Sequence, residues 1–121
     1  MNTKKNFRKI LRGDVYWADL RPISDAVKHM EGGVRPVVVI SNSYNNKYCD
    51  LLNVIPMTSK KDRLPQHQSV TVMHKKDQRK SYLLPENTCV IHKNQLSNFI
   101  CHLDSRSISN MNRAIMIQFE L

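Results

Sequence analysis

The chain of 121 residues carries 19 Lys and Arg against 10 Asp and Glu, which gives a formal net charge of +9. Its length suits a single domain with one modest core, and no apolar run approaches the roughly 20 residues that a membrane-spanning helix needs. The basic N-terminus lacks the apolar stretch of a signal peptide, so we expect a cytoplasmic protein.

In chain order, the sequence predicts five strands. Runs rich in β-branched and aromatic residues, or alternating between apolar and polar, lie at residues 14–20, 35–41, 51–58, 68–73 and 88–92. A long loop is expected at 21–33, a polar turn at 43–47 and a basic loop after residue 73. Loops as long as the first one are often functional.

The C-terminal segment changes to a helical period. Its apolar residues recur at helical spacing, at Ile108, Met111, Ile115 and Phe119. The start of this helix could be capped by Asp104, Ser105 or Ser107. Many short strands and one helix predict a small, barrel-like α+β fold that is mostly β and mostly antiparallel. Edge strands of such a barrel often pair across a dimer.

The positive charge is concentrated in two blocks. Residues 1–13 carry five Lys and Arg and no acid, and residues 59–80 carry seven against two Asp. Two basic blocks on a small domain favour a polyanionic partner, nucleic acid above all. The alternative is that both blocks are solvated and only aid solubility. Of the second block, Lys75, Lys76, Arg79 and Lys80 are expected in a solvated turn.

The three cysteines, Cys49, Cys89 and Cys101, are odd in number and widely spaced. This favours reduced thiols over a disulfide framework. Cys89 and His92, together with Cys101 and His102, offer four potential zinc ligands. Adjacent residues in a strand point to opposite faces, so we predict buried thiols and no metal site.

Two side chains at strand ends suit phosphodiester chemistry. Arg35 stands at the mouth of the second strand, one residue beyond a pair of glycines, and Thr58 ends the third strand beside a basic segment. An arginine can donate two hydrogen bonds to a phosphate and stays charged. A structural arginine that braces the glycine loop is the alternative.

Five segments stand in a recognisable order and spacing: 12–20 (RGDVYWADL), 32–41 (GGVRPVVVIS), 45–48 (NNKY), 54–60 (VIPMTSK) and 64–65 (LP). Through them the chain resembles the MazF/PemK family of bacterial toxin endoribonucleases, most closely over residues 12–73. The resemblance implies an SH3-like barrel of about five to seven antiparallel strands with a C-terminal helix. The toxin domain would span 12–121, preceded by a basic extension at 1–11.

The resemblance also implies an activity and partners. A homodimer would cleave single-stranded RNA without metal or other cofactor, leaving a 2′,3′-cyclic phosphate and a 5′-hydroxyl. A small acidic, partly disordered antitoxin would occupy the RNA groove. The catalytic residues of the family map onto Arg35 and Thr58. RNA contacts are expected from Ser24, Ser59, Lys60, Lys61, Arg63 and Gln95.

The chain departs from the family pattern at two places. Before the glycine pair, relatives commonly carry a glutamate where this chain has Met30, with His29 and Glu31 on either side. Either neighbour could carry a proton or contact RNA, and a solvent-exposed histidine is the alternative for His29. The second departure is Asn94, where relatives commonly carry an acid.

The sequence is compatible with three hypotheses about function. The first is the endoribonuclease toxin. The second is a non-enzymatic toxin of the same fold that binds DNA gyrase, against which the Arg35 and Thr58 pair argues. The third is a module that binds RNA or antitoxin but has lost turnover through the changes at Met30 and Asn94. The aromatic residues Tyr16, Trp17 and Phe99 could stack on bases, but core packing is expected for at least two of them.

Overall fold

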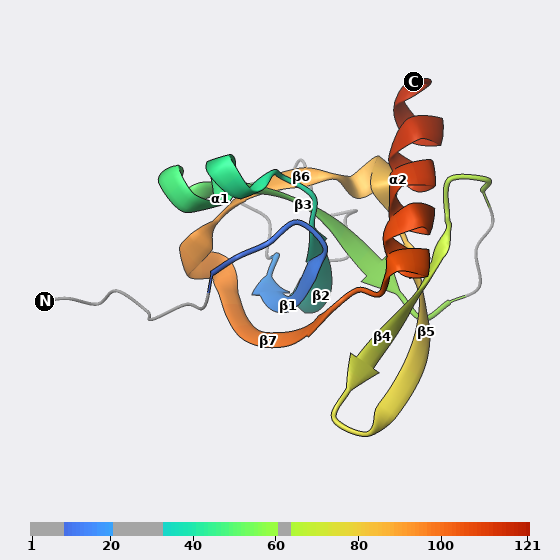
Figure 1. Ribbon diagram of the computed structural model, residues 1–121, viewed down its shortest axis with the longest axis horizontal. Helices are drawn as coiled ribbons and strands as arrows, with labels where there is room; N and C mark the ends of the chain where they lie inside the picture. The colour runs from blue at the N-terminus through green and yellow to red at the C-terminus, as the bar shows by residue number, and fades with distance from the viewer. Residues whose placement is uncertain (1–8, 21–32, 61–63) are drawn as a thin grey trace, which may run out of the picture.

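The computed structural model describes residues 9–20, 33–60 and 64–121 (Figure 1). Within these ranges it is mostly β, and every strand pairing is antiparallel. The strands are β1 (Asp14–Asp19), β2 (Val34–Val39), β3 (Leu51–Thr58), β4 (Ser69–His74), β5 (Asp77–Leu83), β6 (Cys89–His92) and β7 (Leu96–His102). The helices are α1 (Ser43–Tyr48), α2 (Ser105–Phe119) and two short 3-10 turns, η2 (Pro85–Asn87) and η3 (Lys93–Gln95).

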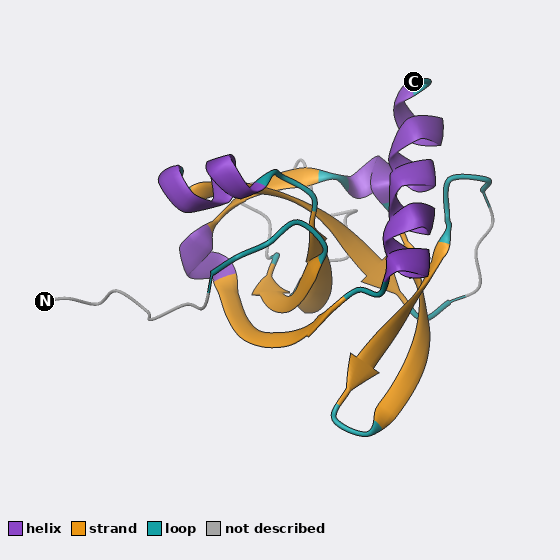
Figure 2. Cartoon of the chain, viewed as in Figure 1, coloured by secondary structure: helices purple, strands orange, loops and turns teal. Residues whose placement is uncertain are grey.

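The strands form one curled sheet in the order β4-β5-β3-β2-β1-β7, with β6 paired to β3 beside β5. Pairing of β1 with β7 contains two register shifts, which bend and twist these strands. The curl brings β4, at one end of the order, into contact with β7 at the other. The result is a half-barrel with helices at its periphery (Figure 2), which confirms the predicted small antiparallel barrel with a C-terminal helix.

The central strand β3 serves different partners along its length. On one side it pairs with β2, and on the other it pairs with β6 over Leu51–Val54 and with β5 at Met57 and Thr58. Pro56 lies where β3 passes from β6 to β5, and its carbonyl accepts from the backbone N–H of Leu84 on that same side. Because the N–H and C=O of a strand residue point to the same side, the missing N–H of Pro56 costs no hydrogen bond to β2.

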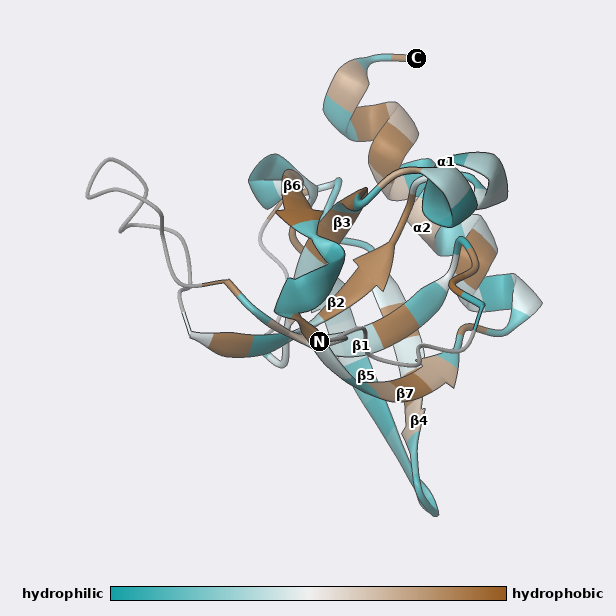
Figure 3. Cartoon of the chain, turned by 90° about the vertical axis from the view of Figure 1, so that its left-hand side faces the viewer, coloured by the Kyte–Doolittle hydropathy of each residue, from teal (hydrophilic) through white to brown (hydrophobic). Residues whose placement is uncertain are grey.

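The apolar run of β2 is buried on both faces of the sheet. Val37 and Val39 point into a cluster inside the curl, whereas Val38 points into a second cluster beneath α2. This explains why the sequence of β2 is continuously apolar and does not alternate. The apolar parts of β2 and β3 are accordingly brown in Figure 3. Ile10, just before β1, also packs in the inner cluster.

The helix α2 begins where the sequence predicts. The Asp104 carboxylate accepts a hydrogen bond of 2.8 Å from the backbone N–H of Ser107, the expected N-cap geometry. Met111 and Ala114 are fully buried against the outer cluster. The hydroxyl of Ser107 accepts from the N–H of Thr71, so the first turn of the helix is also tied to β4.

Three elements differ from the sequence prediction. The expected polar turn at 43–47 is the helix α1, which Asn42 caps and in which Asn46 is buried and bonded to Ser41. The buried contacts of α1 are polar, so its sequence has no helical period of apolar residues from which the helix could be predicted. The expected basic loop after residue 73 is a tight turn followed by β5, whose first four residues are exposed and polar. The strand β7 was not predicted, because its sequence mixes apolar and polar residues without a clear period.

The described part of the chain contains no helix that is long and apolar enough to cross a membrane.

Candidate active site

The register of β2 and β3 places Arg35 and Thr58 together. Val37 pairs with Pro56 and Val38 with Ile55. Continued by two residues towards the end of the ladder, the same register sets Arg35 opposite Thr58. Residues directly opposite in an antiparallel pair point to the same face, so both side chains leave the sheet on one side.

The two residues line one cavity of about 510 Å³. Its walls come from β1 and β7 (Trp17, Ile100), from β2 (Val34, Arg35, Pro36), from β3 and the turn after it (Met57, Thr58, Ser59, Lys60), and from β4 and β5 (Val72, His74, Arg79, Lys80, Ser81). Apolar walls and a few converging polar groups are typical of a binding site. Four of the predicted site residues, Arg35, Thr58, Ser59 and Lys60, are therefore brought together.

Arg35 is half-buried, and its backbone pairs with β1. It lies opposite Ala18 of β1, two residues after Gly33, whose φ of +82° is a conformation that L side chains rarely adopt. The carbonyl of Gly33 accepts a hydrogen bond of 2.9 Å from the N–H of Leu20. No atom lies within 4 Å of the position a Cβ would take at Gly33. Glycine is therefore required there by the backbone turn that leads to Arg35, not by crowding.

The hydroxyl of Thr58 has a defined orientation. Its Oγ1 accepts a hydrogen bond of 3.2 Å from the backbone N–H of Lys60. Because the oxygen accepts this bond, the O–H proton is available to donate to a group in the cavity. A β-branched side chain has few rotamers, so the donor loses little freedom when it binds a ligand.

Cations surround the cavity. Lys60 follows Thr58, and Arg79 and Lys80 enter from β5. The described lining residues include no Asp or Glu, so the site favours a polyanion. Sequence reasoning missed the contribution of Arg79 and Lys80, which were expected in a solvated turn. The alternation of apolar residues at Val70 and Val72 predicts the strand β4, and a strand partner directly after it in the sequence would have included Arg79 and Lys80.

Gln95 lies elsewhere. Its side-chain amide donates to the carbonyl of Asp19 at 2.8 Å, and its Oε1 accepts from the N–H of His92 at 2.8 Å. Both ends of the amide are thus used to close η3 against β1, and Gln95 does not line the cavity. Its contact with RNA stays a prediction. The other predicted residues, Ser24, His29, Glu31, Lys61 and Arg63, lie outside the described residues, as do positions 1–8 of the basic extension.

Two of the three aromatic candidates are core residues, as expected. Tyr16 is 1% exposed, and its ring meets Phe99 edge-on with centroids 5.4 Å apart. Phe99 packs against the same inner cluster. Trp17, by contrast, is half-buried and lines the cavity, where its ring could stack on a base.

Cys89 and Cys101 are poorly suited to nucleophilic chemistry. All three thiols are free, and burial raises the pKa of both Cys89 and Cys101. A raised pKa keeps a thiol protonated at neutral pH, and the thiolate is the nucleophile. Among the residues that the structure describes, no group of three or more His, Cys, Asp or Glu is arranged to hold a metal ion.

Comparison with known proteins assigns the family. Residues 11–119 match the family described as PemK-like, MazF-like toxins of type II toxin-antitoxin systems. This chain belongs to that family. It is 35% identical over 114 residues to endoribonuclease EndoA of Bacillus subtilis, covering 93% of this chain and 96% of EndoA. It is 34% identical to endoribonuclease MazF of Staphylococcus saprophyticus, covering 91% of each chain. By homology to both, it is an endoribonuclease of a toxin-antitoxin module.

The fold is also found among solved structures. A mycobacterial endoribonuclease in complex with its cognate antitoxin superposes with a TM-score of 0.68 at 20% identity, covering 95% of this chain and 97% of that one. At this identity the likeness concerns the fold alone.

Proposed function

We propose that this toxin cleaves single-stranded RNA without a metal ion, by attack of the RNA's own 2′-hydroxyl on the adjacent phosphorus. A new bond forms between the 2′-oxygen and phosphorus while the bond from phosphorus to the 5′-oxygen breaks. The products carry a 2′,3′-cyclic phosphate and a 5′-hydroxyl. One proton leaves the 2′-hydroxyl, and one is delivered to the departing 5′-oxygen. The observation that supports the proposal is that Arg35 and Thr58 line one cationic cavity, at the end of the β2–β3 ladder whose register, continued by two residues, sets them opposite each other.

Arg35 offsets the charge that grows on the phosphoryl oxygens. Its guanidinium can donate two parallel hydrogen bonds to one phosphate, and its half-buried position strengthens those bonds relative to water. Because the guanidinium stays protonated, we assign it to charge stabilisation and not to removal of the 2′-hydroxyl proton.

Thr58 donates its hydroxyl proton to a non-bridging oxygen. The bond from the Lys60 N–H to its Oγ1 fixes the oxygen, and the hydroxyl proton stays available to donate to a phosphoryl oxygen. Ser59 is a possible second donor on the same turn. Preorganised donors of this kind contribute about 10²- to 10³-fold each to the rate.

Lys60 contacts phosphates on either side of the reacting one, together with Lys61 and Arg63. These contacts set affinity and register, whereas sequence is read by groups that touch base edges. Ser24 and Gln95 are the candidates for base contacts. His29 and Glu31 are the candidates for proton transfer, since either side chain can exchange a proton near neutral pH when its surroundings shift its pKa.

The toxin acts as a homodimer and is neutralised by an acidic, partly disordered antitoxin. A net charge of +9 calls for a complementary partner. A mycobacterial endoribonuclease of the same fold has been crystallised with its cognate antitoxin. The mass of the purified chain in solution, alone and with the product of the neighbouring upstream reading frame, tests both statements. A monomer, or no complex with an acidic partner, contradicts them.

The deciding experiment compares wild type with Arg35→Ala on a long mixed-sequence RNA in EDTA. We expect discrete cuts from wild type, cyclic phosphate at their 3′ ends, and cutting reduced by at least about 10²-fold in Arg35→Ala. Thr58→Val should lose a similar factor, while Thr58→Ser, which keeps the hydroxyl, should lose much less. Arg113→Ala is the matched control, because Arg113 is exposed on α2 away from the cavity.

Circular dichroism and urea unfolding establish that every variant is folded. Undiminished cutting by folded Arg35→Ala overturns the site assignment. No cutting by folded, dimeric wild type overturns the enzymatic proposal and favours a gyrase-directed or purely binding role, which a gyrase-poisoning assay then separates.

A further inference from the structure

The hairpin of β4 and β5 stands off the half-barrel. A two-residue turn, Lys75 and Lys76, joins the strands, with His74 paired to Asp77. β5 pairs with β3 only at Leu83 and Tyr82, so its residues 77–81 pair with β4 and with no other described strand. From Tyr82 to Asp77 this ribbon is about 17 Å long, at about 3.4 Å per residue. Figure 1 shows it projecting from the body, and Figure 3 shows its distal part as hydrophilic.

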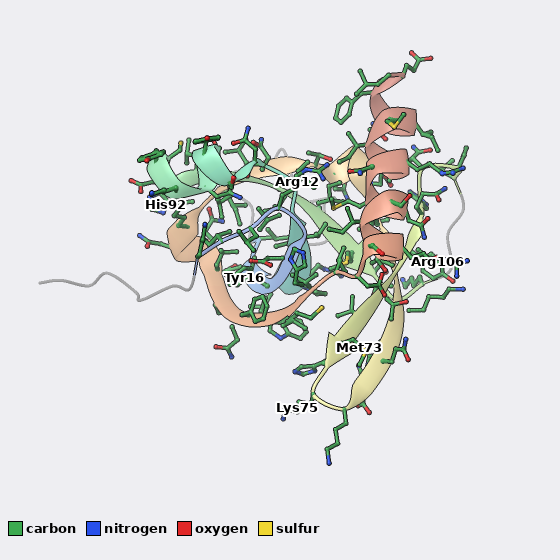
Figure 4. The ribbon with its side chains drawn as sticks, in the orientation of Figure 1. Arg12, Tyr16, Met73, Lys75, His92 and Arg106 are labelled. Atoms are coloured by element: carbon green, nitrogen blue, oxygen red, sulfur yellow. The ribbon has the colours of Figure 1, made fainter. Side chains whose placement is uncertain are left out.

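The ribbon is strongly cationic. It carries Lys75, Lys76, Arg79 and Lys80 against one acid, Asp77, and all five are exposed. The guanidinium of Arg79 lies 3.9 Å from the Asp77 carboxylate, and both side chains are more than 70% exposed. An ion pair so exposed contributes little, so a phosphate can replace the carboxylate. Lys75 is labelled at the tip in Figure 4, on the opposite side of the molecule from His92.

One face of the ribbon is continuous with the proposed active site. The pairs Val72 with Arg79 and Val70 with Ser81 put these side chains on the face that packs towards the outer core. Val72, Arg79 and Ser81 line the same cavity as Arg35 and Thr58. The ribbon also starts at the site, because Tyr82 is the β5 residue that pairs with Thr58.

We propose that the β4–β5 hairpin is an RNA-binding arm, in which Arg79 and Lys80 grip the sugar-phosphate backbone of the strand that leaves the active site. This inference rests on the proposed function, whose substrate it extends beyond the scissile phosphate. The arm is polar, and Met73 is its only exposed large apolar side chain among the described residues, at 44% exposure. Such a surface suits phosphates, whereas a folded protein partner generally needs apolar anchors. The arm sets affinity and the length of RNA bound, not the base sequence.

The test is the double variant Arg79→Gln/Lys80→Gln. Its control is Lys47→Gln/Arg113→Gln, which removes one Lys and one Arg from exposed positions on α1 and α2, outside the cavity. Binding is measured with a fluorescent mixed-sequence single-stranded DNA, by anisotropy, from about 50 to 200 mM salt. This probe lacks the 2′-hydroxyl, so it cannot be cleaved by the proposed chemistry, and binding is measured whether or not the enzyme is active.

Each phosphate contact to a single strand changes the slope of log affinity against log salt by about 0.7. Loss of two contacts should therefore flatten the slope by about 1.4 and weaken binding about 25-fold at 0.1 M salt. The control should change the slope by much less. In RNA cleavage, the hairpin variant should raise KM by a larger factor than the control does, because binding of the sugar-phosphate backbone is weakened while Arg35 and Thr58 remain in place.

If the slope of log affinity against log salt is equal for the hairpin variant and the control, the proposal of an RNA-binding arm is overturned. Unchanged DNA and RNA binding with weakened neutralisation by the acidic partner would reassign the hairpin to protein binding, and also overturns it. A flattened slope in a chain that never cuts RNA supports the arm while the proposed cleavage fails, so the two failures are distinguishable.

Discussion

Gly13 provides a stringent test of how α2 is seated on the sheet. Its φ is +96°, and a Cβ added there would lie 2.6 Å from Cδ1 of Ile108 and 3.2 Å from Cε1 of His102. Gly13 also donates to the carbonyl of Val39 and accepts from the N–H of Leu103. It therefore lies at a point where β2, the end of β7 and the first turn of α2 meet, and Gly13→Ala should disturb all three.

The cost of Gly13→Ala has two parts. Placing an L residue at this φ costs about 1–2 kcal/mol. Forcing a methyl against Ile108 adds about 1–3 kcal/mol, as overpacking of a core does. The expected loss of unfolding free energy is therefore about 2–5 kcal/mol, a large fraction of the stability of a small domain.

Urea unfolding, at one fixed protein concentration, measures the loss. The same substitution is then made in an Ile108→Val background, which removes Cδ1 and by itself costs about 0.5–1.5 kcal/mol. There Gly13→Ala should cost only the backbone part, about 1–2 kcal/mol. An equal cost in both backgrounds would refute the steric argument, and a cost below about 1 kcal/mol in the original background would refute both parts.

Two further predictions concern a helix cap and a loop anchor. Hydrogen bonds from the Ser107 backbone and then its hydroxyl hold the pKa of Asp104 below its usual value. The cap therefore stabilises α2 fully above the unfolded pKa of about 3.9 and is lost as pH falls through the lower folded pKa. Asp104→Asn should remove this acid dependence from urea midpoints, and an unchanged pH profile would contradict the assignment. His67 accepts from the N–H of Leu64 at 3.3 Å and lies 2.7 Å from Glu86. His67→Ala should cost about 1–3 kcal/mol and speed proteolysis near residue 64, and protease resistance equal to wild type would contradict it.

The sequence predicts those elements whose burial is apolar. The apolar run of β2 and the helical period of α2 reveal buried strand and helix directly, because burial in both cases requires apolar side chains. Arg35 and Thr58 could be nominated as strand-end residues, but their proximity depends on register, which a single sequence does not specify. The register becomes clear only when Val37 is seen opposite Pro56.

Elements stabilised by polar contacts were missed. The helix α1 is anchored by Asn46, whose side-chain oxygen accepts from the Ser41 hydroxyl at 2.6 Å. β5 is exposed along the residues that include Arg79 and Lys80. The charged residues in its sequence therefore predict a solvated loop, and no apolar alternation indicates a strand. The hydrogen bonds of the Gln95 amide to the backbone of Asp19 and His92 were likewise not predicted, whereas its contact with RNA stays a prediction. Side-chain hydrogen bonds of this kind cannot be predicted from the pattern of apolar and polar residues in the sequence.

The position of β1 between β2 and β7 has a consequence for when the protein can become active. The Asp14 carboxylate binds His102 at a separation of 88 residues, and the carbonyl of Trp17 accepts from the hydroxyl of Ser97 across 80 residues. Contacts so distant in the chain form slowly and late in folding, because the entropy of closing the loop must be overcome first. The cavity takes Trp17 from the first strand and Ile100 from the last. A nascent chain therefore cannot complete this cavity before β7 has been synthesised, and the messenger that encodes the toxin is nearly fully translated before its product can attack RNA.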